Sequence, residues 1–242
     1  MIAKQPNIPT PQSSARLSAV AALMFTLDKG KPLDNCWADD RYYNMLTPSD
    51  RAFAQLLAKT TIRRLGQIDL LLADFVDRAP PTRVMHTLRL GTTQLLFLDT
   101  PPHAAVHSAV EMTKQLKMST FSGLVNAVLK KISLQGKAII QAQDASTLNT
   151  PEWLMQSWQK AYGNEIATNI AQMHMGEPPL DISVKNNPAL WAEKLSGTVL
   201  PSGSVRLNEA RGIMHMPGFA EGEWWVQDVA ATLPAKLLGD VK

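Results

Sequence analysis

Helical periodicity is the feature that most constrains how this chain can fold. From residue 13 to residue 135, apolar residues recur three and four positions apart, and no stretch alternates convincingly between apolar and polar residues. Spacing of three and four lines one face of an α-helix, whereas a half-buried strand needs a period of two. We therefore expect this part of the chain to form an all-α bundle, with short connections between antiparallel neighbours.

Five helices follow from the pattern. We expect Ser13 or Ser14 to cap the first helix. Thr47 and Asp50 resemble a capping box at the start of the second, which is long and is expected to break near Gly66. The predicted inner faces are, in chain order, Leu17, Val20, Ala21 and Met24; Phe53, Leu56, Leu57, Thr60, Thr61, Leu65 and Ile68; Thr82, Val84, Leu88, Gly91, Leu95 and Leu98; Val106, Ala109, Val110, Thr113 and Leu116; and Leu124, Val125, Val128, Leu129 and Ile132.

The pattern changes beyond residue 140. Pro151 and Gly163 bracket one short helix, and a second runs from Asn164 to about Met175. Two later segments alternate between apolar and polar residues, which indicates short half-buried strands. The alternating apolar residues are Leu180, Ile182 and Val184, then Val205 and Leu207, with a helix predicted over 188–195 between them. A small α+β domain is expected over about 150–218.

Charge is distributed unevenly, although the net charge is only +3. Residues 1–140 hold 17 Lys or Arg and 10 Asp or Glu, a net charge of +7, whereas residues 141–242 hold 7 and 11, a net charge of −4. Clustered Lys and Arg favour a polyanion such as RNA, because phosphate neutralisation releases counterions. A solvated basic surface without a ligand is the open alternative.

Several classes of protein are disfavoured by the sequence. No run of about 18 apolar residues indicates a membrane-spanning helix, and the N-terminus lacks the apolar centre of a signal peptide, so we expect a cytoplasmic protein without a membrane partner. The single cysteine, Cys36, excludes an intramolecular disulfide and a thiolate metal cluster. His103 and His107 lie four apart, but no third ligand is apparent, so we expect no metal site.

Three segments of the first half resemble the NusB family of RNA-binding helical domains. They are DRAFAQLLAKTTIRRLGQID, RLGTTQLLFLDTPPHAAVHSAVEMTKQ and GLVNAVLKKI, and the resemblance spans roughly residues 13–135. NusB folds occur alone, as transcription antitermination factors, and fused to the front of ribosomal-RNA methyltransferases. The hundred or so residues after 135 help to decide between a stand-alone NusB-like factor and the front of a methyltransferase.

Three later segments resemble, in order, the linker and the start of the catalytic domain of the RsmB/Sun family of bacterial small-subunit rRNA cytosine-5 methyltransferases. They are WLMQSWQKAYGNEIA, PPLDISVKN and PGFAEGEWWVQDVAATLPAKLL. The resemblance implies a mainly α chain: a flexible start (1–12), a NusB-like RNA-binding bundle (13–140), a small RRM-like α+β domain (150–218) and the start of a Rossmann-like methyltransferase domain (219–242).

The same resemblance implies a cofactor and a partner for the full-length enzyme. Its family holds S-adenosylmethionine with a DxCAAPGGK motif and uses two later cysteines, and this sequence contains neither. The reaction needs a thiolate that adds to carbon 6 of cytosine, and Cys36 matches neither family cysteine. We therefore expect a truncated chain that binds small-subunit ribosomal RNA but neither binds the cofactor nor methylates.

The expected RNA-binding residues are basic and lie at or near helix ends. Arg16 matches the position where NusB-like domains carry an arginine near RNA, although a solvated helix charge is the alternative. The others are Arg63, Arg64, Lys114, Lys117, Lys130 and Lys131, which could instead compensate helix dipoles. Trp224, Gln227 and Asp228 match the segment that leads into the catalytic domain, and Trp224 and Trp225 are expected to seat the linker against it.

Two other functions stay open at this point. One is a stand-alone NusB-like regulatory protein that binds RNA in transcription antitermination. The other is a purely structural role for the NusB-like domain, in which it supports an enzyme through protein contacts.

Overall fold

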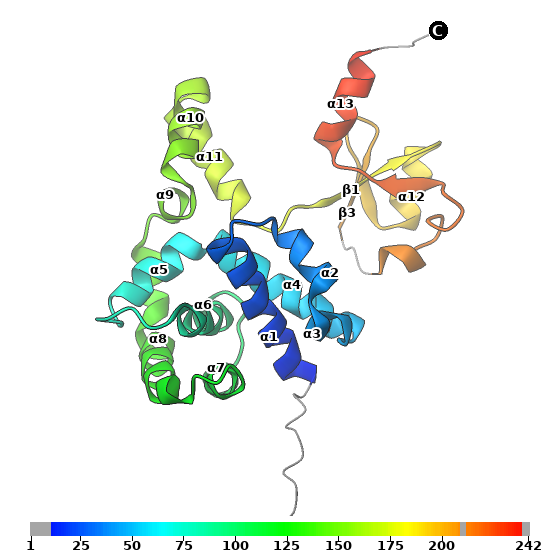
Figure 1. The fold of residues 1–242 in the computed structure, drawn as a ribbon. Coiled ribbons are helices and arrows are strands. Elements are labelled where there is room, and N and C mark those ends of the chain that lie inside the picture. Colours follow the sequence, from blue (N-terminus) through cyan, green and yellow to red (C-terminus); the bar gives the residue numbers. More distant parts are fainter. Residues whose placement is uncertain (1–10, 209–211, 239–242) are drawn as a thin grey trace, which may run out of the picture. The chain divides into compact units, whose positions relative to one another are not determined.

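The computed structural model describes residues 11–208 and 212–238, which form two compact units that meet in the sequence between Gly176 and Glu177 (Figure 1). The chain is mostly helical, with one small antiparallel sheet in the second unit. Among the described residues, no helix combines the length and the apolar character needed to span a membrane.

Every element described in the first unit is helical, which confirms the all-α prediction for residues 13–135. The elements are α1 (Pro11–Leu23), the π-helix η1 (Met24–Asp28), the 3-10 helix η2 (Leu33–Asn35), α2 (Cys36–Asp39), α3 (Arg41–Asn44), α4 (Pro48–Arg63), α5 (Leu65–Ala73), α6 (Thr82–Leu96), α7 (Pro102–Gln115), the 3-10 helix η3 (Ser119–Phe121), α8 (Ser122–Ala142), α9 (Ala145–Asn149), α10 (Glu152–Tyr162) and α11 (Asn164–His174).

Helix α6 is the central element of the first unit. It contacts α1, α4, α5, α7 and α8. Between Val84 and Gln94 every residue is buried except Met85 and Arg89, which are half-buried. Gly91 allows α8 to approach closely, because a methyl group there would overlap the Leu129 side chain. The apolar core of the unit therefore surrounds α6 rather than lying on one side of it.

A chain of polar contacts passes through the buried His86 of α6. The side chain of His86 is 0% exposed, and its Nε2 lies 3.1 Å from Asp28 Oδ1 at the end of η1. Its Nδ1 lies 3.1 Å from Arg89 Nη1, and because a guanidinium only donates, Nδ1 accepts and Nε2 carries the hydrogen. Arg89 also donates two hydrogen bonds to Asp69 of α5, at 2.7 and 2.8 Å. The geometry thus holds a neutral imidazole, and burial lowers its pKa.

The starts of the first two long helices differ in how well the sequence predicted them. Helix α4 begins as expected: Thr47 Oγ1 accepts from the Asp50 N–H at 3.2 Å and donates to the Asp50 carboxylate at 2.7 Å. It ends at Arg63, near the predicted break. Helix α1 begins at Pro11, so the cap predicted at Ser13 or Ser14 is wrong. Ala21, predicted to be buried, is exposed. Helix α1 is buried on most of its surface and contacts α3, α4, α6 and α7. Its buried residues are Ala15, Leu17, Ser18, Ala19, Val20, Ala22 and Leu23.

The second unit contains a four-stranded antiparallel sheet. Its elements are β1 (Leu180–Val184), α12 (Pro188–Lys194), β2 (Gly197–Val199), β3 (Val205–Leu207), the 3-10 helix η4 (Ile213–His215), β4 (Trp224–Val226) and α13 (Val229–Leu237), with the strand order β2-β3-β1-β4. The predicted strands at 180–184 and 205–207 and the helix between them are confirmed. Strands β2 and β4 were not predicted, because Gly197-Thr198-Val199 and Trp224-Trp225-Val226 do not alternate between apolar and polar residues as Val205-Arg206-Leu207 does.

The two faces of this sheet have different characters. One face packs with α12 and forms an apolar core, whose buried members are Ile182, Trp191, Ala192, Leu195, Val205, Leu207 and Trp224. Side chains alternate along a strand, so Asp181, Ser183, Arg206 and Trp225 share the opposite face. There Arg206 donates to both Asp181 oxygens, at 2.8 and 2.9 Å, which lowers the pKa of Asp181.

The two compact units divide the chain differently from the domains predicted at 13–140, 150–218 and 219–242. Helices α10 and α11 belong to the first unit, because Asn149 and Arg64 contact the Met175 sulfur that follows α11. Strand β4 lies within the predicted 219–242 segment, yet it pairs with β1 of the sheet. Residues 239–242, the end of the segment predicted to begin a methyltransferase domain, lie outside the described residues.

We predict that Gly66→Ala destabilises the first unit while Gly123→Ala does not. A methyl group on Gly66 would overlap the backbone carbonyl of Leu148, whereas one on Gly123 would meet nothing within 4 Å. Both glycines are helical, so the gain in helix propensity is shared. Urea unfolding should show Gly66→Ala to be less stable by about 1–3 kcal/mol and Gly123→Ala to be at least as stable as the wild type. Equal stabilities for the two variants would contradict the close approach.

We also predict that acidification destabilises the protein through His86. Because its folded pKa lies below the unfolded value of 6.5, the unfolded chain binds a proton that the folded chain excludes. The free energy of unfolding should therefore fall as pH drops below about 7, with a limiting slope of about 1.4 kcal/mol per pH unit. Urea midpoints between pH 8 and pH 5.5 measure this slope. His86→Gln should flatten the pH dependence of the free energy of unfolding, whereas substitution of the exposed His107 by Gln should leave it unchanged. A wild-type slope of zero would show that protonation of His86 does not destabilise the protein.

Candidate nucleic-acid interface

Positive charge is concentrated on helices α6 to α8 of the first unit. Residues 82–142 hold seven Lys or Arg and two Asp or Glu, a net charge of +5. Residues 1–81 hold ten and eight, a net charge of only +2. A polyanion would therefore be attracted most strongly to the surface that α6, α7 and α8 present.

Helix α8 supplies the exposed lysines of this surface. Lys130, Lys131 and Lys137 are all exposed, and α8 contains no acidic residue. Lys130, Leu134 and Lys137 recur at four and three positions, so they lie along one side of the helix. Leu134, at 84% exposed, leaves that side open to solvent. Lys137 was not among the predicted RNA-binding residues, because the apolar pattern that predicts this helix ends at Ile132.

A hollow of about 440 Å³ lies between α7 and α8, beside these lysines. It is lined by Pro102, His103, Val106, His107 and Val110 of α7 and by Asn126, Lys130 and Ser133 of α8. Histidine, asparagine, serine and lysine side chains all donate hydrogen bonds to phosphate or sugar oxygens. Within residues 11–208 and 212–238, no group of three or more His, Cys, Asp or Glu side chains could hold a metal ion.

The remaining exposed lysines lie at the end of α7. Lys114 Nζ lies 2.6 Å from Glu111 Oε1, one helical turn earlier, and both side chains are largely exposed. An exposed pair of this kind contributes little to stability, so Lys114 can exchange its partner for a phosphate. Lys117 is exposed in the turn after α7, where it adopts a φ of +59°. The structure thus places Lys114 on α7, Lys117 in the turn after it, and Lys130 and Lys131 on the neighbouring helix α8.

The two predicted arginines Arg16 and Arg64 are instead built into the helical unit. Arg16 Nε donates to Gln94 Oε1 at 2.8 Å, and its guanidinium lies 5.0 Å from the centre of the Phe53 ring. Its burial lowers its pKa, so the alternative of a fully solvated helix charge is wrong. Both contacts join α1 to other helices, and a scaffold role accounts for them.

Arg64 has a similar position between helices. Its Nη1 donates to Gln67 Oε1 at 3.3 Å and to the Met175 sulfur at 3.4 Å, and its guanidinium lies 5.2 Å from the Phe97 ring centre. Burial lowers its pKa as well. Its neighbour Arg63, the last residue of α4, is half-buried. Nothing in this geometry tests whether the three arginines contact RNA, and their assignment stays a prediction.

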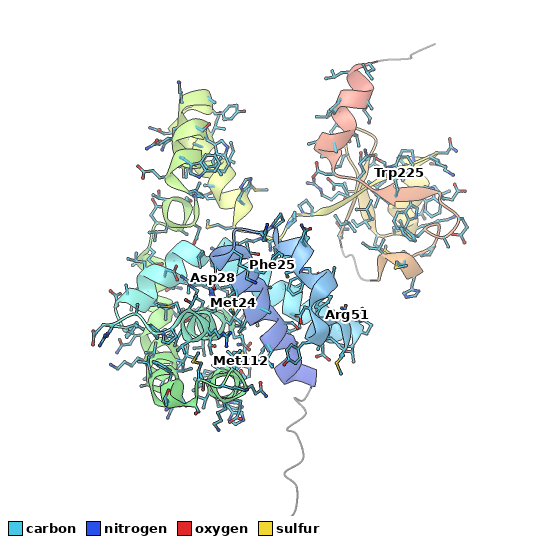
Figure 2. The ribbon with its side chains drawn as sticks, viewed as in Figure 1. Met24, Phe25, Asp28, Arg51, Met112 and Trp225 are labelled. Atoms are coloured by element: carbon cyan, nitrogen blue, oxygen red, sulfur yellow. The ribbon has the colours of Figure 1, made fainter. Side chains whose placement is uncertain are left out.

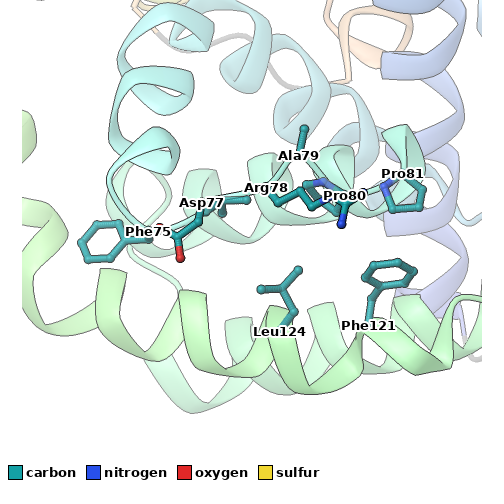
Figure 3. Close-up of a pocket in the computed structure, with 9 residues that line it drawn as sticks. Phe75, Asp77, Arg78, Ala79, Pro80, Pro81, Phe121 and Leu124 are labelled. Atoms are coloured by element: carbon teal, nitrogen blue, oxygen red, sulfur yellow. The ribbon is translucent and has the colours of Figure 1, made fainter.

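A second hollow in the first unit is less suited to a polyanion. Figure 3 shows it between the connection from α5 to α6 and the start of α8. Its volume is about 580 Å³. Its lining is mostly apolar and includes Phe75, Val76, Ala79, Pro80, Pro81, Phe121 and Leu124. Asp77 and Arg78 also line it and carry opposite charges. The stronger candidate for an RNA-binding site is therefore the surface of α7, the turn after it and α8, called the α7–α8 surface below. Its exposed lysines are Lys114, Lys117, Lys130, Lys131 and Lys137.

The residues predicted to lead into a catalytic domain belong to the second unit. Trp224 is only 1% exposed, and its Nε1 donates to the Pro217 carbonyl at 2.8 Å. A residue so deep in its own core has no surface left to seat another domain, so for Trp224 that expectation is wrong. Gln227 accepts from Ser183 Oγ, and the Asp228 carboxylate caps α13 through the Ala230 N–H. Trp225, labelled in Figure 2, is 45% exposed.

Cys36 is not placed for nucleophilic chemistry. It lies at the start of α2 and is 8% exposed. Burial, followed by the nearby Asp40 and Asp34 carboxylates, raises the pKa of its thiol to about 12. Only the thiolate attacks, so a thiol with such a pKa is inert at neutral pH.

Comparisons with known proteins identify one family model and several related proteins that match this chain. A model of the NusB family matches residues 13–134. The chain is 30% identical over 239 residues to the ribosomal RNA small subunit methyltransferase B of Pasteurella multocida, covering 93% of this chain and 52% of that protein. It is 31% identical over 217 residues to the probable ribosomal RNA small subunit methyltransferase B of Synechocystis, covering 80% and 48%.

A solved structure is also similar. The crystal structure of PH0851 matches with a TM-score of 0.60 and 15% sequence identity, covering 97% of this chain and 56% of that one. At this identity the likeness concerns the fold alone. The chain spans about half the length of the curated relatives that it matches.

We predict that Cys36 is unreactive in the folded protein. A thiol-specific disulfide reagent at pH 8 should leave the native chain unmodified and should label one thiol per chain in 6 M guanidinium, because unfolding removes the burial and the two carboxylates that raise the pKa. Absorbance of the released chromophore measures both states. Rapid labelling of the native protein would show that the thiol is accessible and ionised.

Proposed function

The chain belongs to the NusB family, and from this membership we propose that it is the RNA-binding module of a small-subunit rRNA cytosine-5 methyltransferase. The observation that carries the proposal is the net charge of +5 on residues 82–142, whose exposed lysines lie on α7, the turn after it and α8. Similarity to the two named methyltransferases extends beyond the NusB match, through both units of the chain.

We infer that the lysines at the α7–α8 surface contact the RNA backbone. Lys114, Lys117, Lys130 and Lys131 are exposed point charges, and Lys137 extends their surface along α8. Aromatic side chains do not interleave with them, which favours recognition of backbone and shape over stacking on this unit. For Arg16 and Arg64 we propose an indirect role, in which they join helices of the bundle that carries the lysines. For the half-buried Arg63 we keep the proposal of a direct RNA contact.

For the second unit we infer an RRM-like fold. Its order β2-β3-β1-β4, with a helix between β1 and β2, agrees with the arrangement of a split βαββαβ unit, in which the first and third strands are central. A 3-10 helix, η4, stands where such a unit carries its second long helix. Residues 219–242 would lead into a Rossmann-like catalytic domain in the longer relatives.

We assign the methyl-transfer chemistry, and with it S-adenosylmethionine, to such a catalytic domain rather than to the described residues. The family's cofactor motif does not occur in the sequence, and its one cysteine is buried with a raised pKa. We place the protein in the cytoplasm, where ribosomal RNA is modified. A stand-alone antitermination factor would give no reason for similarity to the methyltransferases over both units.

We predict that Lys130→Gln/Lys131→Gln weakens RNA binding through lost phosphate contacts. Affinity for a small-subunit rRNA fragment should fall roughly tenfold at 50 mM salt, and the slope of log affinity against log salt should decrease by about 2. Fluorescence anisotropy with labelled RNA measures both quantities. The matched control is Lys160→Gln/Lys185→Gln, which removes two exposed lysines from the acidic part of the chain.

The control should bind as the wild type does. Equal losses for the two double variants would mean that only net charge matters and that the α7–α8 surface is not an interface. A wild-type chain that bound no rRNA fragment at low salt would refute the proposed function altogether. Binding to antitermination leader RNA, but not to small-subunit rRNA, would favour the regulatory alternative instead.

A further inference from the structure

A small hollow on the sheet of the second unit has no part in the α7–α8 surface. Its volume is about 320 Å³. The sheet contributes Ser183 and Val184 of β1 and Trp225 of β4, the β2–β3 connection contributes Gly203 and Ser204, and α13 contributes Thr232, Ala235 and Lys236, with Gln227 between β4 and α13. The hollow thus combines an exposed aromatic ring, several hydrogen-bonding groups and one cation. Its volume is at the small end of the range for ligand sites.

The hydrogen bonds of Gln227 leave a donor at this hollow. Its Oε1 accepts two hydrogen bonds, from Ser183 Oγ at 2.8 Å and from Trp225 Nε1 at 3.0 Å. These two donors fix which way the amide points. Its Nε2 has no partner among residues 11–208 and 212–238, so the amide presents an unused N–H donor where Gln227 lines the hollow. The same bond holds the Trp225 indole in place.

Trp225 offers a flat apolar surface that the fold does not use. The residue is 45% exposed, whereas the adjacent Trp224 fills the core on the other face of the sheet. The central strands offer no aromatic side chain beside it, because β1 carries Ser183 and β3 carries Arg206, which is held by Asp181. The platform therefore lies on the edge strand β4, next to Lys236 of α13.

We propose that this hollow binds one unpaired nucleobase of an RNA strand. Trp225 stacks on the base, the Gln227 Nε2 donates to an acceptor on the base edge, and Lys236 contacts a neighbouring phosphate. This inference rests on the proposed RNA-binding function and adds a single-stranded contact to it. Base stacking on an aromatic ring does not itself depend on charge. The excess of acidic residues in this half of the chain repels the RNA backbone, so Lys236 supplies the local positive charge that the backbone contact needs.

The test compares two RNA probes on the full chain. One is a fully paired RNA duplex, and the other is a hairpin with the same stem and a loop of unpaired nucleotides. Trp225→Ala should weaken hairpin binding by about 5- to 100-fold and leave duplex binding unchanged, while Trp225→Phe should retain most of the affinity because a phenyl ring still stacks. Gln227→Glu, which replaces the amide donor by an acceptor, should also weaken hairpin binding alone.

Trp153→Ala is the matched control, because Trp153 on α10 is 70% exposed and lies outside the second unit. It should bind both probes as the wild type does. The inference is overturned if Trp225→Ala binds the hairpin normally, or if Trp153→Ala loses as much affinity. Equally tight, Trp225-dependent binding of a free nucleoside monophosphate would overturn the assignment to RNA. A wild-type chain that bound neither probe would refute the proposed function itself, which is a different result.

Discussion

The structure of the first unit depends on satisfying the polar side chains of a buried helix. A buried polar group without a partner costs about 1–3 kcal/mol. The neighbours of α6 supply partners for several of its polar side chains, whereas the buried Thr92 hydroxyl has none among the described residues. Four of its side chains each bond to a different element, α1, α4, η1 or α5. These pairs are Gln94 with Arg16, Thr93 with Thr61, His86 with Asp28, and Arg89 with Asp69. Hydrophobic burial assembles the bundle, and these pairs fix how its helices are placed around α6.

The long helices could be predicted from the sequence because several turns repeat one apolar face. The central position of α6 could not be predicted, because His86, Thr93 and Gln94 are polar and are expected at the surface until their partners are known. Some short elements were not predicted for a different reason: neither β2 nor β4 alternates between apolar and polar residues, and η1 is a five-residue π-helix that continues directly from α1. The unpredicted strand β4 also explains why residues 224–226 join the sheet rather than a separate segment.

The candidate site was predictable to the extent that its residues act alone. Lys130 and Lys131 need only be basic, on a helix and exposed, and the sequence indicates the first two properties. Arg16 and Arg64 show the limit of this reasoning, because a charged residue in a sequence does not reveal whether a distant Gln94 or Met175 holds it. The role of Gln227 was hidden for the same reason: its amide is oriented by Ser183, 44 positions away.

The close approach of α8 to α6 fixes the position of the helix that carries most of the lysines of the α7–α8 surface. Gly91 and Gly136 leave no room for side chains between these helices: a methyl group on the first would overlap Leu129, and one on the second would press on Leu96 and Ile132. Helix α8 is thereby fixed along its length, and Lys130 and Lys137 lie about 10 Å apart along it at 1.5 Å per residue. Lysines on a fixed helix bind most tightly to an RNA backbone whose phosphates match their spacing, whereas charges on a mobile segment bind any polyanion. Rigid packing inside the helical unit therefore supports recognition of RNA shape on its outside.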